Sequence, residues 1–306
     1  MHTTIMTGAT RGIGRAAAED ILRADRDAHL VLLGREESGR RAADELRAIG
    51  GNVTLVDTDL ASVDSIRAAT ATVNHLLDQG ELPALRTFAG NAGVQFVDAL
   101  HTTTDGYETT FAVNVLANHL LLRAFEHQFS APGRIVITTS DTHFGDFRHT
   151  GGLVPAPRWS APEILAKPSA FDKPTTVAAG RTAYSTSKLA VVHLVHEWAR
   201  RLPAGIDIVS YNPSLVGGTG LSRAAGPVDR FINRWIIPAL SITPIVDTVP
   251  AAGRKLADAV LGHTGADAPT GSYLDRTRVA PSSDESYDPA REHALWDFMD
   301  QVRHTG

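Results

Sequence analysis

The sequence predicts an α/β protein built on a doubly wound parallel sheet with helices on both faces. Short apolar runs alternate with segments of helical periodicity from the first residue onward. The runs are rich in Val, Ile, Leu and Thr, which is typical of parallel strands buried on both faces. A glycine-rich stretch joins the first apolar run to the first helical segment. These features favour one α/β domain over residues 1–306, with right-handed crossovers between its strands.

Six apolar runs are the predicted strands of this sheet. They are TTIM (3–6), HLVLLG (29–34), NVTLV (52–56), LRTFAG (85–90), RIVITT (134–139) and IDIVSY (206–211). Helices are predicted between them, beginning with GIGRAAAEDILRA (12–24) and SGRRAADELRAIG (38–50). The second helix closes at Gly50 and Gly51, because glycine is common just after the last turn of a helix.

Two segments interrupt this alternation. Residues 141–181 are rich in proline and glycine and have no clear period, so they are predicted to form a long insertion after the fifth strand. Residues 217–250 mix apolar residues with glycine and proline and are predicted to form a substrate lid. Four bulky side chains of this second segment could line the lid, form an oligomer contact or belong to the core: Phe231, Ile232, Trp235 and Ile236.

Composition excludes several classes of function. A formal charge of −5 gives no electrostatic support to a nucleic-acid partner. The chain has no cysteine, which excludes disulfides, thiolate nucleophiles and cysteine metal sites. No apolar run reaches the roughly 18 residues of a membrane span, and MHTTIMTGAT at the N-terminus has no targeting pattern. The prediction is a cytoplasmic protein with no membrane span.

The loop TGATRGIG (7–14) predicts a dinucleotide site of the Rossmann type. Gly8 suits a tight turn, Gly12 lets the backbone approach a pyrophosphate, and Gly14 allows close helix–strand packing. The following helix presents free N–H groups and a positive dipole end to the phosphates. The alternative is a glycine-rich turn without a ligand. The candidate contacts in this loop also include Thr10, Arg11 and Ile13.

The end of the second predicted strand favours NADP(H) as the cofactor. An NAD site usually has an Asp or Glu here for the ribose hydroxyls, but the sequence has Gly34 followed by Arg35. Arg35, together with Arg11 from the glycine loop, could neutralise a 2′-phosphate. Alternatively, both arginines are solvated or pair with Glu36 or Glu37.

Asp59 and Leu60 follow the third predicted strand. The Asp59 carboxylate would suit a contact with the adenine edge of the cofactor. A helix N-cap is the alternative, for a helix that starts at Ala61 or Ser62.

Seven short motifs occur in order along nearly the whole chain. They are TGATRGIG, DL (59–60), NAG (91–93), Asn114 in FAVNVLANHLL, Ser140 in RIVITTS, YSTSK (184–188) and NPSLVGGTGL (212–221). In this order they resemble the short-chain dehydrogenase/reductase family. The sequence is most similar to the branch that contains retinol dehydrogenases, WW-domain oxidoreductases and protochlorophyllide reductases. Members of that branch also have a long insertion between the serine and the tyrosine.

The resemblance implies a role for each motif and a homodimer or homotetramer. The cofactor contacts that it adds are Asn91, Ala92, Gly93, Pro213, Val216 and Thr219. The chain departs from the family pattern at Gly90, where asparagine is frequent, and at Ser214, where glycine is usual. The sequence leaves open whether Ser214 alters the backbone path toward the nicotinamide.

Tyr184 and Lys188 lie four residues apart, on one face of a helix predicted over 182–202. A nearby ammonium and an oxidised nicotinamide would lower the tyrosine pKa from its usual value of about 10. Tyr184 is therefore the predicted general acid/base, and Lys188 could also hold the nicotinamide ribose. Ser140 could donate a hydrogen bond to the substrate oxygen. The resemblance implies that Asn114 completes a proton path to solvent through its carbonyl and a water molecule.

Three histidines lie in or near the predicted site segments. His193 and His196 could meet on one helix face, but no third ligand is evident, so no metal site is predicted. His143 could line the substrate mouth or be a solvated loop residue.

The predicted function is an NADP(H)-dependent oxidoreductase that transfers a hydride between the nicotinamide and a carbonyl or alcohol. Apolar residues in 141–181 and 217–250 suggest a bulky apolar substrate. The alternative is a catalytically silent NADP(H)-sensing protein on the same fold. A nucleotide-sugar epimerase or dehydratase is disfavoured because three residues separate Gly8 from Gly12.

Overall fold

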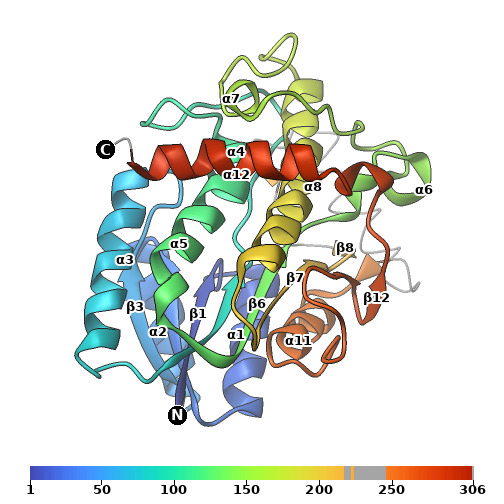
Figure 1. Ribbon diagram of the computed structural model, residues 1–306. Helices are drawn as coiled ribbons and strands as arrows, with labels where there is room; N and C mark the ends of the chain where they lie inside the picture. Colours follow the sequence, from blue (N-terminus) through green and yellow to red (C-terminus); the bar gives the residue numbers. More distant parts are fainter. Residues whose placement is uncertain (217–221, 224–245, 305–306) are drawn as a thin grey trace.

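The computed structural model describes residues 1–216, 222–223 and 246–304, and its central element is an eight-stranded sheet (Figure 1). The strand order is β12-β11-β7-β6-β4-β1-β2-β3. All neighbouring strands are parallel except β11 and β12, which are antiparallel. The strands of this sheet are β1 (His2–Thr7), β2 (Ala28–Gly34), β3 (Asn52–Asp57), β4 (Leu85–Gly90), β6 (Phe129–Thr138), β7 (Ile206–Asn212), β11 (Tyr273–Asp275) and β12 (Arg278–Ala280).

Two short strand pairs lie outside this sheet. They are formed by β5 (Gln95–Phe96) with β9 (Ser222–Arg223), and by β8 (Leu215–Val216) with β10 (Val246–Asp247). Thr219 and the four bulky residues Phe231, Ile232, Trp235 and Ile236, with most of the predicted lid 217–250, lie outside the described residues.

Helices cover both faces of the large sheet. The longer ones are α1 (Gly12–Ala24), α2 (Glu36–Ala48), α3 (Val63–Asp78), α5 (Ala117–Phe125), α8 (Val177–Arg201), α11 (Val249–Val260) and α12 (Pro289–His304). The short helical segments are α4 (Thr109–Phe111), the π-helix η1 (Ala112–Leu116), η2 (Glu126–Gln128), η3 (Asp141–Phe144), α6 (Phe147–Thr150), α7 (Pro162–Leu165) and η5 (Asp284–Ser286).

The predicted doubly wound parallel sheet is confirmed. Each of the six predicted strands is present, and β6 begins five residues earlier than expected, at Phe129. The sequence did not predict β11 and β12, because each strand has three residues, too few to show a strand pattern.

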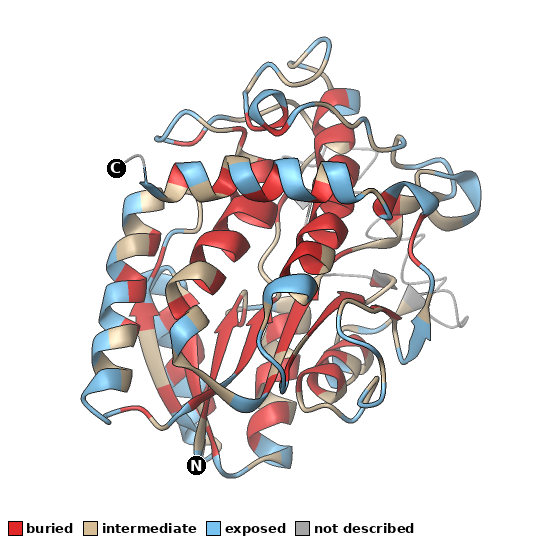
Figure 2. Ribbon diagram, in the orientation of Figure 1, coloured by how far each residue is buried: buried red, intermediate tan, exposed pale blue. Residues whose placement is uncertain are grey.

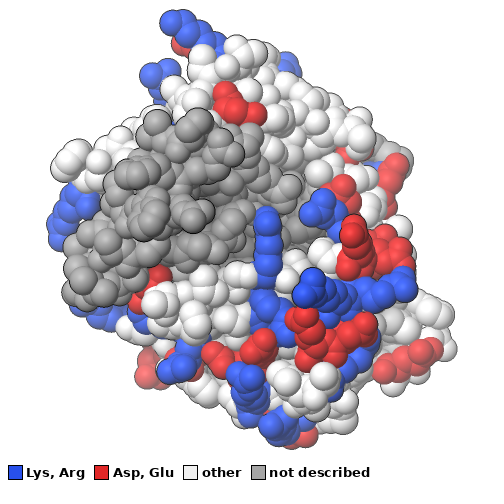
Figure 3. All heavy atoms as spheres, turned by 180° about the vertical axis from the view of Figure 1, so that it is seen from behind, with Lys and Arg blue, Asp and Glu red and all other residues white. Residues whose placement is uncertain are grey.

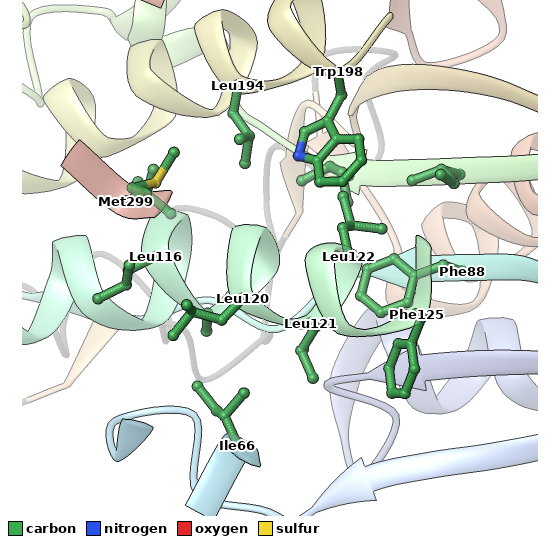
Figure 4. Close-up of a cluster of buried hydrophobic side chains, with 14 of the residues drawn as sticks. Ile66, Phe88, Leu116, Leu120, Leu121, Leu122, Phe125, Leu194, Trp198 and Met299 are labelled. Atoms are coloured by element: carbon green, nitrogen blue, oxygen red, sulfur yellow. The ribbon is translucent and has the colours of Figure 1, made fainter. Parts of the chain in front are cut away.

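The core on one face of the sheet joins the helices that carry the site. It combines apolar side chains of α3, α5, α8 and α12 with those of the sheet. Figure 4 shows Trp198 and Leu194 from α8 facing Leu120, Leu122 and other side chains of α5. Helix α12 lies across α5 and α8 (Figure 1), and its buried side chains include Trp296 and Met299. The position of α8 is therefore fixed by packing along most of its length.

The opposite face has a second core, formed by α1, α2 and α11. Its apolar residues recur at helical spacing, as in Ala17, Ala18, Ile21 and Leu22 of α1. Figure 2 shows the resulting division, with buried strands between helices that are exposed on their outer sides. The carboxyl ends of the parallel strands are thus held at one edge of the sheet.

The predicted insertion contains more regular structure than the sequence suggested. Residues 141–176 include η3, α6 and α7, and the last five residues of the predicted insertion already belong to α8. Helix α8 begins at Val177, five residues before the predicted start, because Thr176 caps it by accepting a hydrogen bond from the Ala179 amide (3.3 Å).

Charged side chains of both signs lie beside one another on the rear face of the molecule (Figure 3). Helices α1 and α2 contribute ion pairs such as Arg15–Glu19 and Arg41–Glu45. Among the described residues, no helix is long and apolar enough to cross a membrane. Over the same ranges, no group of three or more His, Asp or Glu side chains could hold a metal ion.

Gly90 ends β4 where the family often has asparagine, and the structure gives a steric reason for glycine. A Cβ atom at Gly90 would overlap Asn118 Oδ1 and lie 2.7 Å from Ile137 Cδ1. The Asn118 amide donates to the Asn114 carbonyl (2.9 Å), so Asn118 occupies the space that a larger residue at position 90 would need.

We expect Gly90→Ala to lower the free energy of unfolding by about 1–3 kcal/mol, because it overpacks this contact. Asn118→Ala in the same chain should recover part of the loss, which a double-mutant cycle in urea would measure. Gly34→Ala is the matched control, since a Cβ at this strand end would lie 3.4 Å from Thr10 Cγ2. Equal losses from Gly90→Ala and Gly34→Ala would contradict the steric argument.

Candidate active site

A cavity of about 930 Å³ lies at the carboxyl ends of the parallel strands. The predicted site residues that line it are Gly8, Thr10, Arg11, Gly12, Ile13, Gly14, Arg35, Asp59, Leu60, Asn91, Ala92, Gly93, Ser140, Tyr184, Lys188, Pro213 and Val216. Asn114 does not line the cavity. Residues that are distant in the sequence are thus brought together around one space.

The glycine loop has the backbone that a bound phosphate needs. Gly8 and Gly12 have φ angles of +71° and +57°, in the left-handed region that favours glycine. A Cβ at Gly14 would overlap the Gly8 carbonyl oxygen. Arg11 precedes α1 without capping it by a side-chain hydrogen bond, which leaves the first N–H groups of the helix without a side-chain partner. This end of α1 suits an anion.

Arg11 and Arg35 are exposed at the rim of the same cavity. Within the described part of the chain, neither side chain forms an ion pair. Glu36 instead pairs with Arg40 on the next turn of α2. The structure therefore does not show the predicted alternative in which Arg35 pairs with Glu36.

Asp59 is not a helix N-cap, so that alternative is wrong. Helix α3 begins at Val63, and its cap is Ser62, whose hydroxyl accepts from the Ser65 amide (3.3 Å). Asp59 Oδ1 accepts from the Ala61 amide (3.0 Å) in the turn before the helix. The carboxylate stays exposed beside the cavity.

The NAG motif after β4 is tied to the glycine loop. Asn91 Nδ2 donates to the Gly8 carbonyl (3.3 Å), and the Ala92 amide donates to Thr7 Oγ1 (3.1 Å). These bonds fix the ends of β1 and β4 relative to each other.

Tyr184, Lys188 and Ser140 meet at the junction of α8 and β6. Tyr184 is buried, and the Ser140 hydroxyl is close enough to lower the pKa of the Tyr184 hydroxyl. Lys188 Nζ donates to the Thr138 carbonyl (3.0 Å) and lies 5.5 Å from the centre of the Tyr184 ring. Thr139 Oγ1 donates to the Lys188 carbonyl (2.8 Å), which ties α8 to the end of β6.

Burial moves the pKa of both titratable groups toward the neutral form. It raises the pKa of the Tyr184 phenol to about 12, against the opposing effect of the Ser140 hydroxyl. It lowers the pKa of Lys188 to about 8. The predicted lowering of the Tyr184 pKa includes the effect of an oxidised nicotinamide, so it stays a prediction. In the polypeptide alone, burial raises this pKa.

Asn114 lies in the π-helix η1 and forms hydrogen bonds to two segments that surround the site. Its side chain accepts from the Val94 amide (2.8 Å) and donates to Ser187 Oγ (3.0 Å). Its carbonyl accepts from Asn118 (2.9 Å). Asn114 thus joins the loop after β4 to α8, and its predicted place in a proton path stays a proposal.

Ser214 has a φ angle of +63°, so it adopts the left-handed conformation for which glycine is favoured. This conformation costs a non-glycine residue about 1–2 kcal/mol. Two hydrogen bonds hold it: the Ser214 amide donates to Asn212 Oδ1 (2.9 Å), and Arg276 donates to Ser214 Oγ (2.8 Å).

His143 neither lines the cavity nor faces solvent, so both predictions for it are wrong. Its Nδ1 lies 2.6 Å from the Ser140 carbonyl oxygen, and its Nε2 accepts from the Ser283 amide (3.2 Å). Burial lowers its pKa to about 4, so the ring is neutral near pH 7. His143 thereby anchors η3 behind Ser140.

His193 and His196 both face Glu292 of α12, with Nδ1–Oε1 distances of 3.8 and 3.0 Å. They link α8 to α12, away from the cavity.

Sequence reasoning did not predict four charged residues that line the cavity: Asp141, Arg148, Asp275 and Arg276. Asn212 Nδ2 donates to both carboxylates, and its bond to Asp275 is 3.1 Å long. Burial and the charge of Asp275 raise the pKa of Asp141. Asp275 ends β11 and Arg276 follows it, so the pairing of β11 with β7 in the sheet brings both residues to the site.

We expect Lys188→Met to raise the free energy of unfolding by about 1–3 kcal/mol near pH 7, because burying the ammonium is unfavourable. The pKa of Lys188 is lower in the folded protein than in the unfolded chain. Stability of the unmodified protein should therefore rise as the pH increases from about 8 toward 10. The advantage of the variant should shrink over this window. Urea denaturation at several pH values would test this, and a pH-independent difference would contradict it.

Comparison with known proteins agrees with this geometry. A family model described as short chain dehydrogenase matches residues 2–151. DnrU of Streptomyces sp. (strain C5), named as a daunorubicin C-13 ketoreductase, is 30% identical over 303 residues, which cover 97% of this chain and 90% of DnrU. Mouse retinol dehydrogenase 11 is also 30% identical, over 96% of this chain and 83% of its own length.

Solved structures show the same fold. A short chain dehydrogenase from Burkholderia cenocepacia J2315, determined in complex with NADP, is 22% identical, with a TM-score of 0.63 over 90% of this chain and 95% of that structure. The family match and the two relatives of 30% identity place the chain in the short-chain dehydrogenase/reductase family of oxidoreductases.

Proposed function

We propose that the protein is an NADP(H)-dependent carbonyl reductase in which Tyr184 is the general acid/base. One observation carries this proposal: Tyr184, Lys188 and Ser140 line the same cavity as the glycine loop. DnrU is named for the reduction of a ketone, which supports reduction as the direction of the reaction.

The residues of the loop fit the proposed cofactor. The uncapped end of α1 and the glycine backbone would hold the pyrophosphate, and Arg11 and Arg35 would hold the 2′-phosphate. NADPH, when bound, supplies the hydride. Lys188 would hydrogen-bond the nicotinamide ribose, and Asp59 would contact the adenine edge.

Ser140 and Tyr184 would act on the substrate oxygen. The Ser140 hydroxyl donates a hydrogen bond that polarises the carbonyl. As the carbonyl carbon is reduced, the Tyr184 hydroxyl transfers its proton to the oxygen, which yields an alcohol and a phenolate. The Lys188 ammonium stabilises this phenolate, and solvent returns the proton, with the Asn114 carbonyl as a proposed part of the path.

The alternative of a catalytically silent sensor is not favoured, because the cavity keeps all three reactive side chains together. The cytoplasmic location and the homodimer or homotetramer remain proposals that come from the sequence. The substrate is proposed to be bulky, since Phe96, Val113, Leu153 and Val154 line the cavity beyond the reactive groups.

Tyr184→Phe should lower kcat for NADPH-dependent ketone reduction by about 100-fold or more, because it removes the proton donor. NADPH affinity, measured by fluorescence titration, should change little. Tyr211→Phe is a matched control: this tyrosine is also buried, but it does not line the cavity, and its hydroxyl has no hydrogen-bond partner among the described residues. Full activity of Tyr184→Phe would refute the mechanism.

Arg35→Ala and Arg11→Ala should each raise KM for NADPH by about 10-fold, as expected for the loss of one charge-assisted hydrogen bond. KM for NADH should stay nearly constant, since NADH has no 2′-phosphate. Arg40→Ala, on the same helix but paired with Glu36, serves as the control. Equal changes for both cofactors would rule out selection of the 2′-phosphate by these arginines.

A further inference from the structure

The sequence contains one six-residue pattern twice, each time close to the cavity. FVDALH (96–101) and FGDFRH (144–149) share phenylalanine, aspartate and histidine at identical spacing. The first follows the NAG motif, and the second lies in the insertion after Ser140.

The two copies have a similar local geometry. In the first, His101 Nε2 lies 2.9 Å from Asp98 Oδ1, and its ring is centred 4.1 Å from the Phe96 ring. In the second, His149 Nδ1 lies 2.8 Å from Asp146 Oδ1, and its ring stacks on Phe144 at 3.9 Å with an interplanar angle of 12°. Each histidine is thus held by a carboxylate and by an aromatic face.

The copies differ in which side chains they present to the cavity. Phe96 lines it from the first copy, and Arg148 and His149 line it from the second. The site therefore receives one phenylalanine ring and one imidazole ring from a repeated local structure. His101 does not line the cavity, and this makes it an internal reference for His149.

Three contacts fix the orientation of the His149 side chain. Asp146 accepts from both its backbone amide (2.8 Å) and its Nδ1, and Phe144 covers one face of the ring. Gly145 fixes the turn before it, with a φ angle of +70° and no room for a Cβ, which would lie 2.7 Å from Pro157. The imidazole position is therefore set before any ligand arrives.

The Asp146 carboxylate also determines whether Nε2 of His149 donates or accepts a hydrogen bond. Asp146 accepts the proton of Nδ1, so Nε2 of the neutral ring carries a lone pair and accepts hydrogen bonds. Nε2 of His149 has no hydrogen-bond partner among the described residues, and the side chain is 28% exposed.

We propose that His149 is a substrate-binding residue whose Nε2 accepts a hydrogen bond from a hydroxyl group on an aromatic carbonyl substrate. The two aromatic side chains, Phe96 and His149, suit a planar ring, and a fixed acceptor suits a phenol at a distance from the reacting carbonyl. This inference rests on the proposed reductase function, and it names the substrate class as hydroxylated aromatic ketones.

The test uses the full chain saturated with NADP⁺ and matched ligands: the 5-, 6- and 7-hydroxy derivatives of 1-tetralone and their methyl ethers. Calorimetry gives the ratio of the dissociation constants within each pair. At least one hydroxy ketone should bind about 10-fold more tightly than its ether, because a site built to accept a hydrogen bond discriminates against an analogue without the donor.

His149→Phe keeps a ring to stack on Phe144, and it should reduce the ratio to about 1. Asp146→Asn can still cap α6, but its amide donates to Nδ1 and makes Nε2 a donor, so the preference should move toward the ether. His101→Phe, in the other copy of the motif, should retain the ratio of the unmodified protein. The Asp146 variant keeps the test decisive if His149→Phe does not fold.

An unchanged ratio in His149→Phe or Asp146→Asn would overturn the proposal, as would failure of every hydroxy ketone to bind. Oxidation of NADPH by the same ketones is measured in parallel. Tight, His149-dependent binding without NADPH oxidation would contradict the reductase function and leave the binding role of His149 intact.

Discussion

The whole site depends on the attachment of α8 to the carboxyl end of β6. Lys188 Nζ donates to the Thr138 carbonyl, and Thr139 Oγ1 donates back to the Lys188 carbonyl. These two bonds place one turn of a long, packed helix directly against the end of β6, two residues before Ser140. The relation between phenol, ammonium and serine hydroxyl is thus fixed by the core and not by a loop.

Taken alone, this arrangement of the site lowers the stability of the folded protein. Lys188, which has no acidic partner in the described part of the chain, is buried, and Tyr184 beside it has a raised pKa. Ser214 holds a left-handed backbone nearby. Strain and buried charge of this kind are common where a protein fixes reactive groups before a ligand binds. The extensive core between α3, α5, α8 and α12 supplies the stability that these features remove.

The insertion after β6, on the side of the cavity proposed for the substrate, is also held in place by side-chain contacts. Its first turn is anchored by His143, which bonds to the Ser140 carbonyl and the Ser283 amide. The next turn is closed by Gly145 and capped by Asp146, which also orients His149. A segment rich in glycine and proline therefore has fixed positions, because polar side chains bond to its backbone.

The sequence by itself determined the features whose cause is local. Strand and helix alternation follows from apolar periodicity, the glycine loop from backbone angles that only glycine adopts easily, and the Tyr184–Lys188 face from the helical repeat. Tertiary structure alone decided the rest: that Ser62 and not Asp59 caps α3, that Asp275 and Arg276 reach the cavity, and that His143 is an anchor. It also decided the direction in which the pKa of Tyr184 shifts in the polypeptide, because burial depends on neighbours in space, which local sequence spacing does not determine.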